Sequence, residues 1–158
     1  MNLVRKQSDQ FTFRLPKREK ELLLMLLDQY PLIPPRHQPL SKTTGSADAD
    51  ANQRLLDEGL AEHRRETRSL ISRLVRNERR WKKEATGWQM TLKGPEIESL
   101  LQALNDIRVG SWIVLGSPEE HLWDVKLDEN SAPHAWAMEI AGWFESALLE
   151  ALQQKDTE

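Results

Sequence analysis

One charged residue falls within the apolar face of the helix predicted over residues 95–116. Arg108 lies one turn after Leu104 and one turn before Trp112, and the face also includes Ile97, Leu100, Leu101 and Leu115. A guanidinium group stays protonated, so a buried arginine must find an acceptor. The pattern predicts that Arg108 is buried against a carboxylate that fixes the register of the helix. The alternative is that it lines a pocket for an anionic ligand.

Two polar neighbours complete a short motif around Arg108. On the helical wheel, Asn105 is expected at the edge of the apolar face and Asp106 on the opposite side. The run LNDIRV at 104–109, followed by Leu115 and Gly116, resembles the signature of an uncharacterised bacterial family. That family is best known from actinobacteria, its gene often lies near that of the Clp protease adaptor, and some members are labelled transcriptional regulators.

The resemblance extends to both ends of the chain. FTFRLPKREKELLLMLL near the start is similar to the family's strand and leucine-rich helix, and HAWAMEIAGWFESALLEAL near the end is similar to its closing helix. The sequence departs from the pattern after Val109, where 111–115 lacks a second arginine. The resemblance implies a small, mainly helical cytoplasmic protein in which Asn105, Asp106 and Arg108 share a role, and it implies no activity.

No pattern in the sequence indicates an enzyme. The chain has no cysteine, and its seven glycines form no phosphate-binding cluster. The motifs of hydrolases, nucleotide-binding proteins and zinc proteases are absent. Metal-binding side chains occur at Glu119, Glu120, His121, Asp124 and His134, but their spacing matches no metal motif. We therefore expect no catalytic residues, no metal and no cofactor.

Basic residues are concentrated in the middle of the chain. Residues 54–83 contain ten Lys or Arg and five Asp or Glu, a net charge of +5, whereas residues 94–158 contain three and thirteen, a net charge of −10. A nucleic acid could contact Arg64, Arg65, Arg68, Arg76, Arg79, Arg80, Lys82 and Lys83. The interleaved acidic residues and a pI of about 5.9 favour pairing with the acidic half of the same or a second chain. A DNA-binding transcriptional regulator is therefore our second hypothesis.

The elements that must position these residues are mostly helices. Apolar periodicity and proline positions predict four helices, at 16–30, 52–83, 95–116 and 133–153. Alternation predicts strands at 10–15 and 88–92, whose likeness suggests that they pair, and 81–84 is expected to form a hairpin with the second strand. The fold class is therefore mainly α, a helical bundle of about four helices with a small two- or three-stranded β element. We expect one helical domain over residues 1–158, with a mobile linker at 31–51.

The first and last helices carry more apolar residues than one buried stripe can hold. In the last helix, Trp136, Ile140 and Phe144 are expected to face the core. The residues that remain outside the buried stripes are Leu24 and Met25 in the first helix and Met138 and Leu149 in the last helix, with the small residue Gly142 beside Met138. Because exposed apolar surface marks partner sites, we expect a homodimer with the last helix in the interface.

These observations rank the functions that we expect. The first hypothesis is a non-catalytic interaction or regulatory module of unknown pathway that self-associates and binds a protein partner. The third, after DNA binding, is a small anionic-ligand binder or enzyme built around Arg108. The longest apolar run, Leu22 to Leu27, is too short to span a bilayer, and the first residues lack a signal-peptide pattern. We therefore expect no membrane partner and a cytoplasmic protein.

Overall fold

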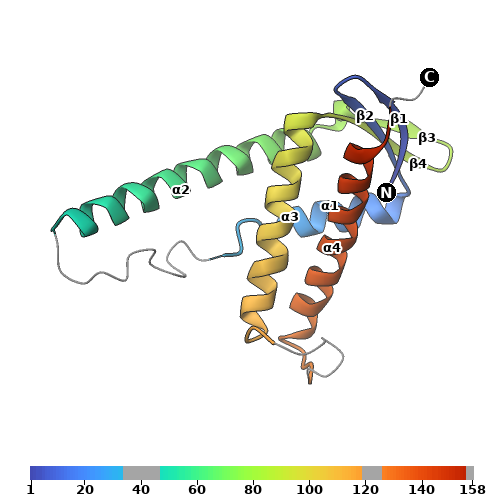
Figure 1. Cartoon of the computed structure of the whole chain (residues 1–158). Helices are drawn as coiled ribbons and strands as arrows, with labels where there is room; N and C mark the ends of the chain where they lie inside the picture. Colours follow the sequence, from blue (N-terminus) through green and yellow to red (C-terminus); the bar gives the residue numbers. More distant parts are fainter. Residues whose placement is uncertain (34–46, 119–125, 156–158) are drawn as a thin grey trace.

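The computed structural model describes residues 1–33, 47–118 and 126–155 (Figure 1). The elements in chain order are β1 (Asn2–Gln7), β2 (Gln10–Leu15), α1 (Lys17–Leu27), α2 (Ala47–Val75), the short 3-10 helix η1 (Glu78–Arg80), β3 (Trp81–Glu84), β4 (Gly87–Lys93), α3 (Gly94–Val114) and α4 (Ala132–Gln153). The predicted mainly helical class and the four helices are confirmed for this part of the chain. The β element is larger than predicted, because it has four strands.

The four strands form one antiparallel sheet in the order β1-β2-β4-β3. The predicted pairing of the two similar strands is confirmed, with Phe13 opposite Met90, and so is the hairpin between β3 and β4. The additional strand is β1, at the edge of the sheet. A register shift between Leu3 and Arg5 interrupts its alternation, which explains why the sequence pattern did not predict it.

One face of the sheet is covered by helices and forms the core. Side chains alternate across the strands, so that Phe13, Leu15 and Leu92 are buried while Gln10 and Arg14 are exposed on the other face. Helices α1, α3 and α4 and the C-terminal end of α2 supply most of the other core residues, which include Leu23, Leu26, Ile71, Leu74, Leu100, Leu104, Ile107, Phe144 and Leu148. The sheet and these helices therefore share a single hydrophobic core.

A lysine is packed between two tryptophans at the edge of this core. The Lys20 ammonium group on α1 lies 3.6 Å from the ring centroid of Trp88 and 4.5 Å from that of Trp81. Burial lowers the pKa of Lys20, and the nearby Glu78 carboxylate opposes this shift. The two cation–π contacts attach the first turn of α1 to β3 and β4.

Helix α2 differs from the predicted helix at both ends. It begins at Ala47, within the predicted linker, and ends at Val75, because the residues after it form η1 and β3. Most of the predicted linker, residues 34–46, lies outside the described residues. Figure 1 shows α2 running away from the sheet and the other helices, with only its C-terminal part against them. Within the described residues, no helix is long and apolar enough to cross a membrane.

Candidate functional site

Asp106 is the buried charged residue of α3. The helical wheel had placed it on the side opposite the apolar face. The residue is 8% exposed. Its Oδ1 atom accepts the backbone N–H groups of Leu32 at 2.6 Å and Ile33 at 3.2 Å. One turn further on, a Cβ atom placed on Gly110 would lie 2.9 Å from the Leu32 side chain, so the two backbones are very close there. Asp106 therefore attaches the segment after α1 to α3.

Arg108 lies at the surface, and the prediction that it is buried is wrong. Its side chain is 44% exposed, and its Nε atom lies 2.9 Å from Oε2 of Glu145 on α4. Its Nη2 atom donates to Oδ1 of Asn105 at 2.8 Å. The Glu145 side chain is only 14% exposed, and burial raises the pKa of its carboxyl group while Arg108 lowers it. The expected carboxylate partner exists, but the pair bridges two helices at the edge of the core.

The structure brings part of the predicted motif together with part of the predicted interface. A Cβ atom placed on Gly142 would lie 3.8 Å from Cδ of Arg108, so the arginine stem lies close to the glycine. Asn105 and Arg108 on α3 therefore share one surface with Gly142 and Glu145 on α4. Asp106, the third member of the motif, lies elsewhere, in contact with the segment after α1.

The surplus apolar residues of the first and last helices lie only partly at the surface. Met25 is 50% exposed and Leu149 is 47% exposed, as expected, whereas Leu24 and Met138 are half-buried. Trp136 was expected in the core but is 38% exposed. The buried residues of α4 are instead Ala135, Ala137, Ala141, Phe144, Leu148 and Ala151.

A second exposed tryptophan accompanies Trp136 on α4. Trp143 is 44% exposed and lies two helical turns from Trp136, with the half-buried Ile140 between them. Sequence reasoning overlooked this aromatic stripe because it assigned Trp136 to the core. The sequence signal for it is the pair of small residues Ala137 and Ala141, one helical turn apart. They mark a buried face of α4 that does not include Trp136 or Trp143.

Three leucines in the N-terminal part of α2 are exposed. Leu55 is 66% exposed, and Leu56 and Leu60 are each 47% exposed. Leu56 and Leu60 continue, at helical spacing, the stripe of Thr67 and Ile71, both of which are buried against the other helices. The C-terminal half of this apolar stripe is thus part of the core, whereas its N-terminal half faces solvent.

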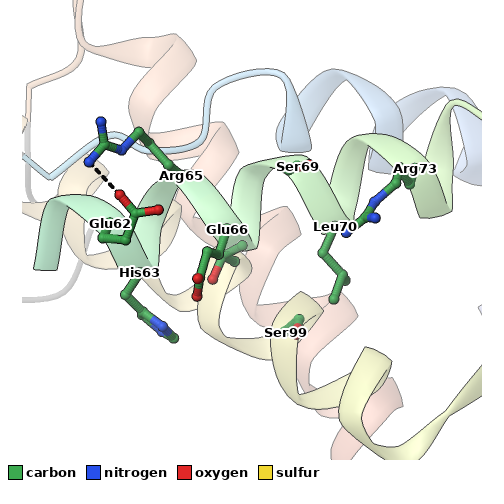
Figure 2. Close-up of a pocket in the computed structure, with 9 residues that line it drawn as sticks. Glu62, His63, Arg65, Glu66, Ser69, Leu70, Arg73 and Ser99 are labelled. Atoms are coloured by element: carbon green, nitrogen blue, oxygen red, sulfur yellow. Dashed lines mark hydrogen bonds and ion pairs between the residues drawn. The ribbon is translucent and has the colours of Figure 1, made fainter. Parts of the chain in front are cut away.

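An open groove lies beside α2 where the helix meets α3. Its volume is about 530 Å³, and its lining includes His63, Glu66, Leu70 and Arg73 from α2 and Ser99 from α3 (Figure 2). The Nε2 atom of His63 lies 3.2 Å from Oε1 of Gln102 on α3. The groove lining begins at Glu62, two residues after the last exposed leucine, Leu60, so both features lie on the same helix.

The eight basic residues that could contact a nucleic acid are distributed over separate parts of the structure. Arg64, Arg65, Arg68 and Arg76 come from α2 or its end, and the Arg76 guanidinium pairs with the Asp28 carboxylate. Arg79, Arg80 and Lys82 line a second cleft beside Gln10 and Lys93 on the sheet. Arg80 lies 2.8 Å from the Glu96 carboxylate, and Lys83 is exposed on β3. The basic run of the sequence therefore contributes to two different surfaces.

The described residues contain no group of three or more His, Cys, Asp or Glu arranged to bind a metal. Four of the five metal-type residues noted in the sequence, Glu119, Glu120, His121 and Asp124, lie outside the described residues. Comparison with protein-family models, with curated proteins and with solved structures finds no match to this chain. The resemblance based on the motif at 104–109 therefore stays a prediction.

Proposed function

We propose that this protein is a non-catalytic interaction module that self-associates through apolar helix surfaces. The observation that carries the proposal is the apolar stripe of α2. Leu56 and Leu60 of this stripe are exposed, and Leu55 beside them is exposed as well, while the stripe is buried at Thr67 and Ile71. Exposed leucines that extend a buried stripe indicate a surface that a partner covers.

The length of the projecting segment supports the same proposal. Helix α2 has 29 residues, and none of residues 51–62 is buried. An isolated helix of fewer than about 12–15 residues is only marginally stable in water. Gly59 lowers the helix propensity of this segment further. A partner that covers Leu56 and Leu60 would supply the tertiary contacts that such a helix lacks.

Co-purification from the source cells tests the proposal. The tagged wild-type chain is compared with a Leu56→Glu variant, and the proteins retained by each are identified and quantified, including an untagged copy of the chain. We expect one or more proteins to be retained by the wild type and lost from the variant. Identical retained proteins for the two chains would contradict an interaction function for α2.

A DNA-binding regulator is the second hypothesis and stays untested. The cleft lined by Arg79, Arg80 and Lys82 is the feature of the structure that it would use. The ion pairs of Arg80 with Glu96 and of Arg76 with Asp28 neutralise part of the basic charge. We therefore rank this function below protein interaction.

A further inference from the structure

We infer that the partner of α2 is a second copy of this chain, whose own α2 helix packs antiparallel to the first and crosses it near Leu60. The inference rests on the proposed function, because it names the partner of the same apolar surface. It adds the orientation of the two helices and the point at which they cross.

The exposed leucines and the groove are arranged so that the leucines of each copy can pack against the groove of the other. The leucines at 55, 56 and 60 precede the groove, which runs from Glu62 to Arg73 along the same helix (Figure 2). In an antiparallel pair that crosses at Leu60, the residues before Leu60 in one copy lie level with the residues after it in the other. Leu55 and Leu56 of each copy then lie level with residues 65 and 64 of its partner, at the start of the partner's groove. A two-fold axis makes both contacts identical, as in most homodimers.

The charges along α2 favour the antiparallel orientation. Residues 51–62 contain one arginine and three acidic residues, a net charge of −2, whereas residues 63–75 contain four arginines and one glutamate, a net charge of +3. An antiparallel pair brings the acidic half of each copy against the basic half of the other. A parallel pair would place like charges together, which is unfavourable.

The competing position for an interface is α4, and one of its residues provides a matched control. Leu149 is 47% exposed, the same fraction as Leu56 and Leu60, and it lies on the face that the sequence predicted for dimerisation. A glutamate at Leu149 therefore introduces the same charge at the same degree of exposure. Only the location on the molecule differs.

Sedimentation velocity of the purified full chain across the micromolar range tests the inference. We expect a dimer for the wild type and for Leu149→Glu, and a monomer for Leu60→Glu. Far-UV circular dichroism and thermal melting check that each variant is folded. If Leu60→Glu does not fold, Leu56→Glu replaces it in the comparison. A wild type that is monomeric throughout, or a dimer that survives in a folded Leu60→Glu or Leu56→Glu variant, overturns the inference.

The same experiment separates failure of this inference from failure of the proposed function. A dimer that is lost in Leu149→Glu and kept in Leu60→Glu places the interface on α4, so that self-association stands and the α2 pairing fails. For a monomeric wild type, the co-purification comparison with Leu56→Glu shows whether α2 binds a different protein. If that comparison also shows no difference, the proposed function fails as well.

Disulfide crosslinking tests the orientation, because the chain has no cysteine of its own. Asn52→Cys and Glu66→Cys lie on opposite sides of Leu60 along the helix and on a similar face. For an antiparallel pair, we expect the mixture of the two variants to form a crosslinked heterodimer after oxidation, and each variant alone to crosslink several-fold less. A parallel pair would crosslink each variant with itself, and this result would overturn the proposed orientation.

Discussion

The Asp106 carboxylate on α3 accepts the backbone N–H of Leu32 at 2.6 Å, although 74 residues separate the two in the sequence. The Ile33 N–H donates to the same oxygen at 3.2 Å. A buried N–H group that loses its acceptor raises the free energy of the folded state. The position of the segment that follows α1 therefore depends on one carboxylate of α3.

Substitution of Asp106 should destabilise the protein more than substitution of Arg108. We expect Asp106→Ala to cost about 1–3 kcal/mol, because two partly buried N–H groups lose their acceptor. Arg108→Ala should cost about 0–1 kcal/mol, because the arginine side chain is 44% exposed and solvent weakens its ion pair. Urea unfolding of both variants measures the difference. The reverse order would mean that Arg108 is the buried member of the motif.

Two glycines that face other elements should respond differently to an added methyl group. A Cβ atom on Gly110 would lie 2.9 Å from the Leu32 side chain, whereas one on Gly142 would make an ordinary contact with Arg108. We expect Gly110→Ala to cost about 1–3 kcal/mol through overpacking. Gly142→Ala should be neutral or stabilising by up to about 1 kcal/mol, because alanine is the better helix former. Thermal melting compares them, and equal melting temperatures would contradict the close approach of α3 to Leu32.

The raised pKa of Glu145 should make its contribution to stability fall as the pH rises. Burial raises this pKa above the ordinary value of 4.5, so the folded state binds the proton more tightly than the unfolded state. Stability is therefore lost as the pH rises from the unfolded pKa through the folded pKa. Glu145→Gln does not titrate at this position, so we expect the stability of the wild type relative to this variant to decrease as the pH rises above the ordinary carboxyl pKa of 4.5. Parallel urea titrations measure this difference, and an increase would mean that the ion pair with Arg108 outweighs burial.

An electrophoretic mobility shift series tests the DNA-binding hypothesis. We expect no retarded complex at about 150–200 mM salt, because binding that depends on phosphate contacts weakens steeply in this range. A complex that persists would support the hypothesis. The double variant Arg79→Ala with Lys82→Ala would then be compared with Arg65→Ala with Arg68→Ala, to identify which of the two surfaces binds.

The four helices could be predicted because local signals mark them. Pro16, Pro95 and Pro133 stand at or next to helix starts, where the missing N–H group costs nothing. The β3–β4 hairpin could also be predicted, because glycine favours turns and Gly87 lies between the two strand patterns. In the structure, Gly87 takes a positive φ value, and a Cβ atom there would lie 2.4 Å from the Leu15 carbonyl oxygen. The central sheet pair followed from the repeated alternation at Phe13 and Met90.

The candidate site could be predicted only in part, because burial depends on partners that are distant in the sequence. A helical wheel places Arg108 between Leu104 and Trp112, but it cannot show that Leu32 and Ile33 bring two N–H groups to the other side of α3. The sequence could not show that Leu56 and Leu60 are exposed, because the spacing of apolar residues along α2 does not change where the helix leaves the core. The position of α3, against which α2 packs, decides where that stripe leaves the core.

The centre of the sheet joins two stretches of chain that are synthesised far apart. The Thr12 and Thr91 hydroxyl groups on β2 and β4 are 3.0 Å apart and 79 residues distant in sequence. The β1–β2 and β3–β4 hairpins are local, so each can form within about 1–10 μs once its residues are available. Their association must also overcome the entropy of closing the long intervening loop. On the ribosome, the first hairpin and α1 should therefore wait for the second, with Phe13 and Leu15 accessible to chaperones until β4 emerges.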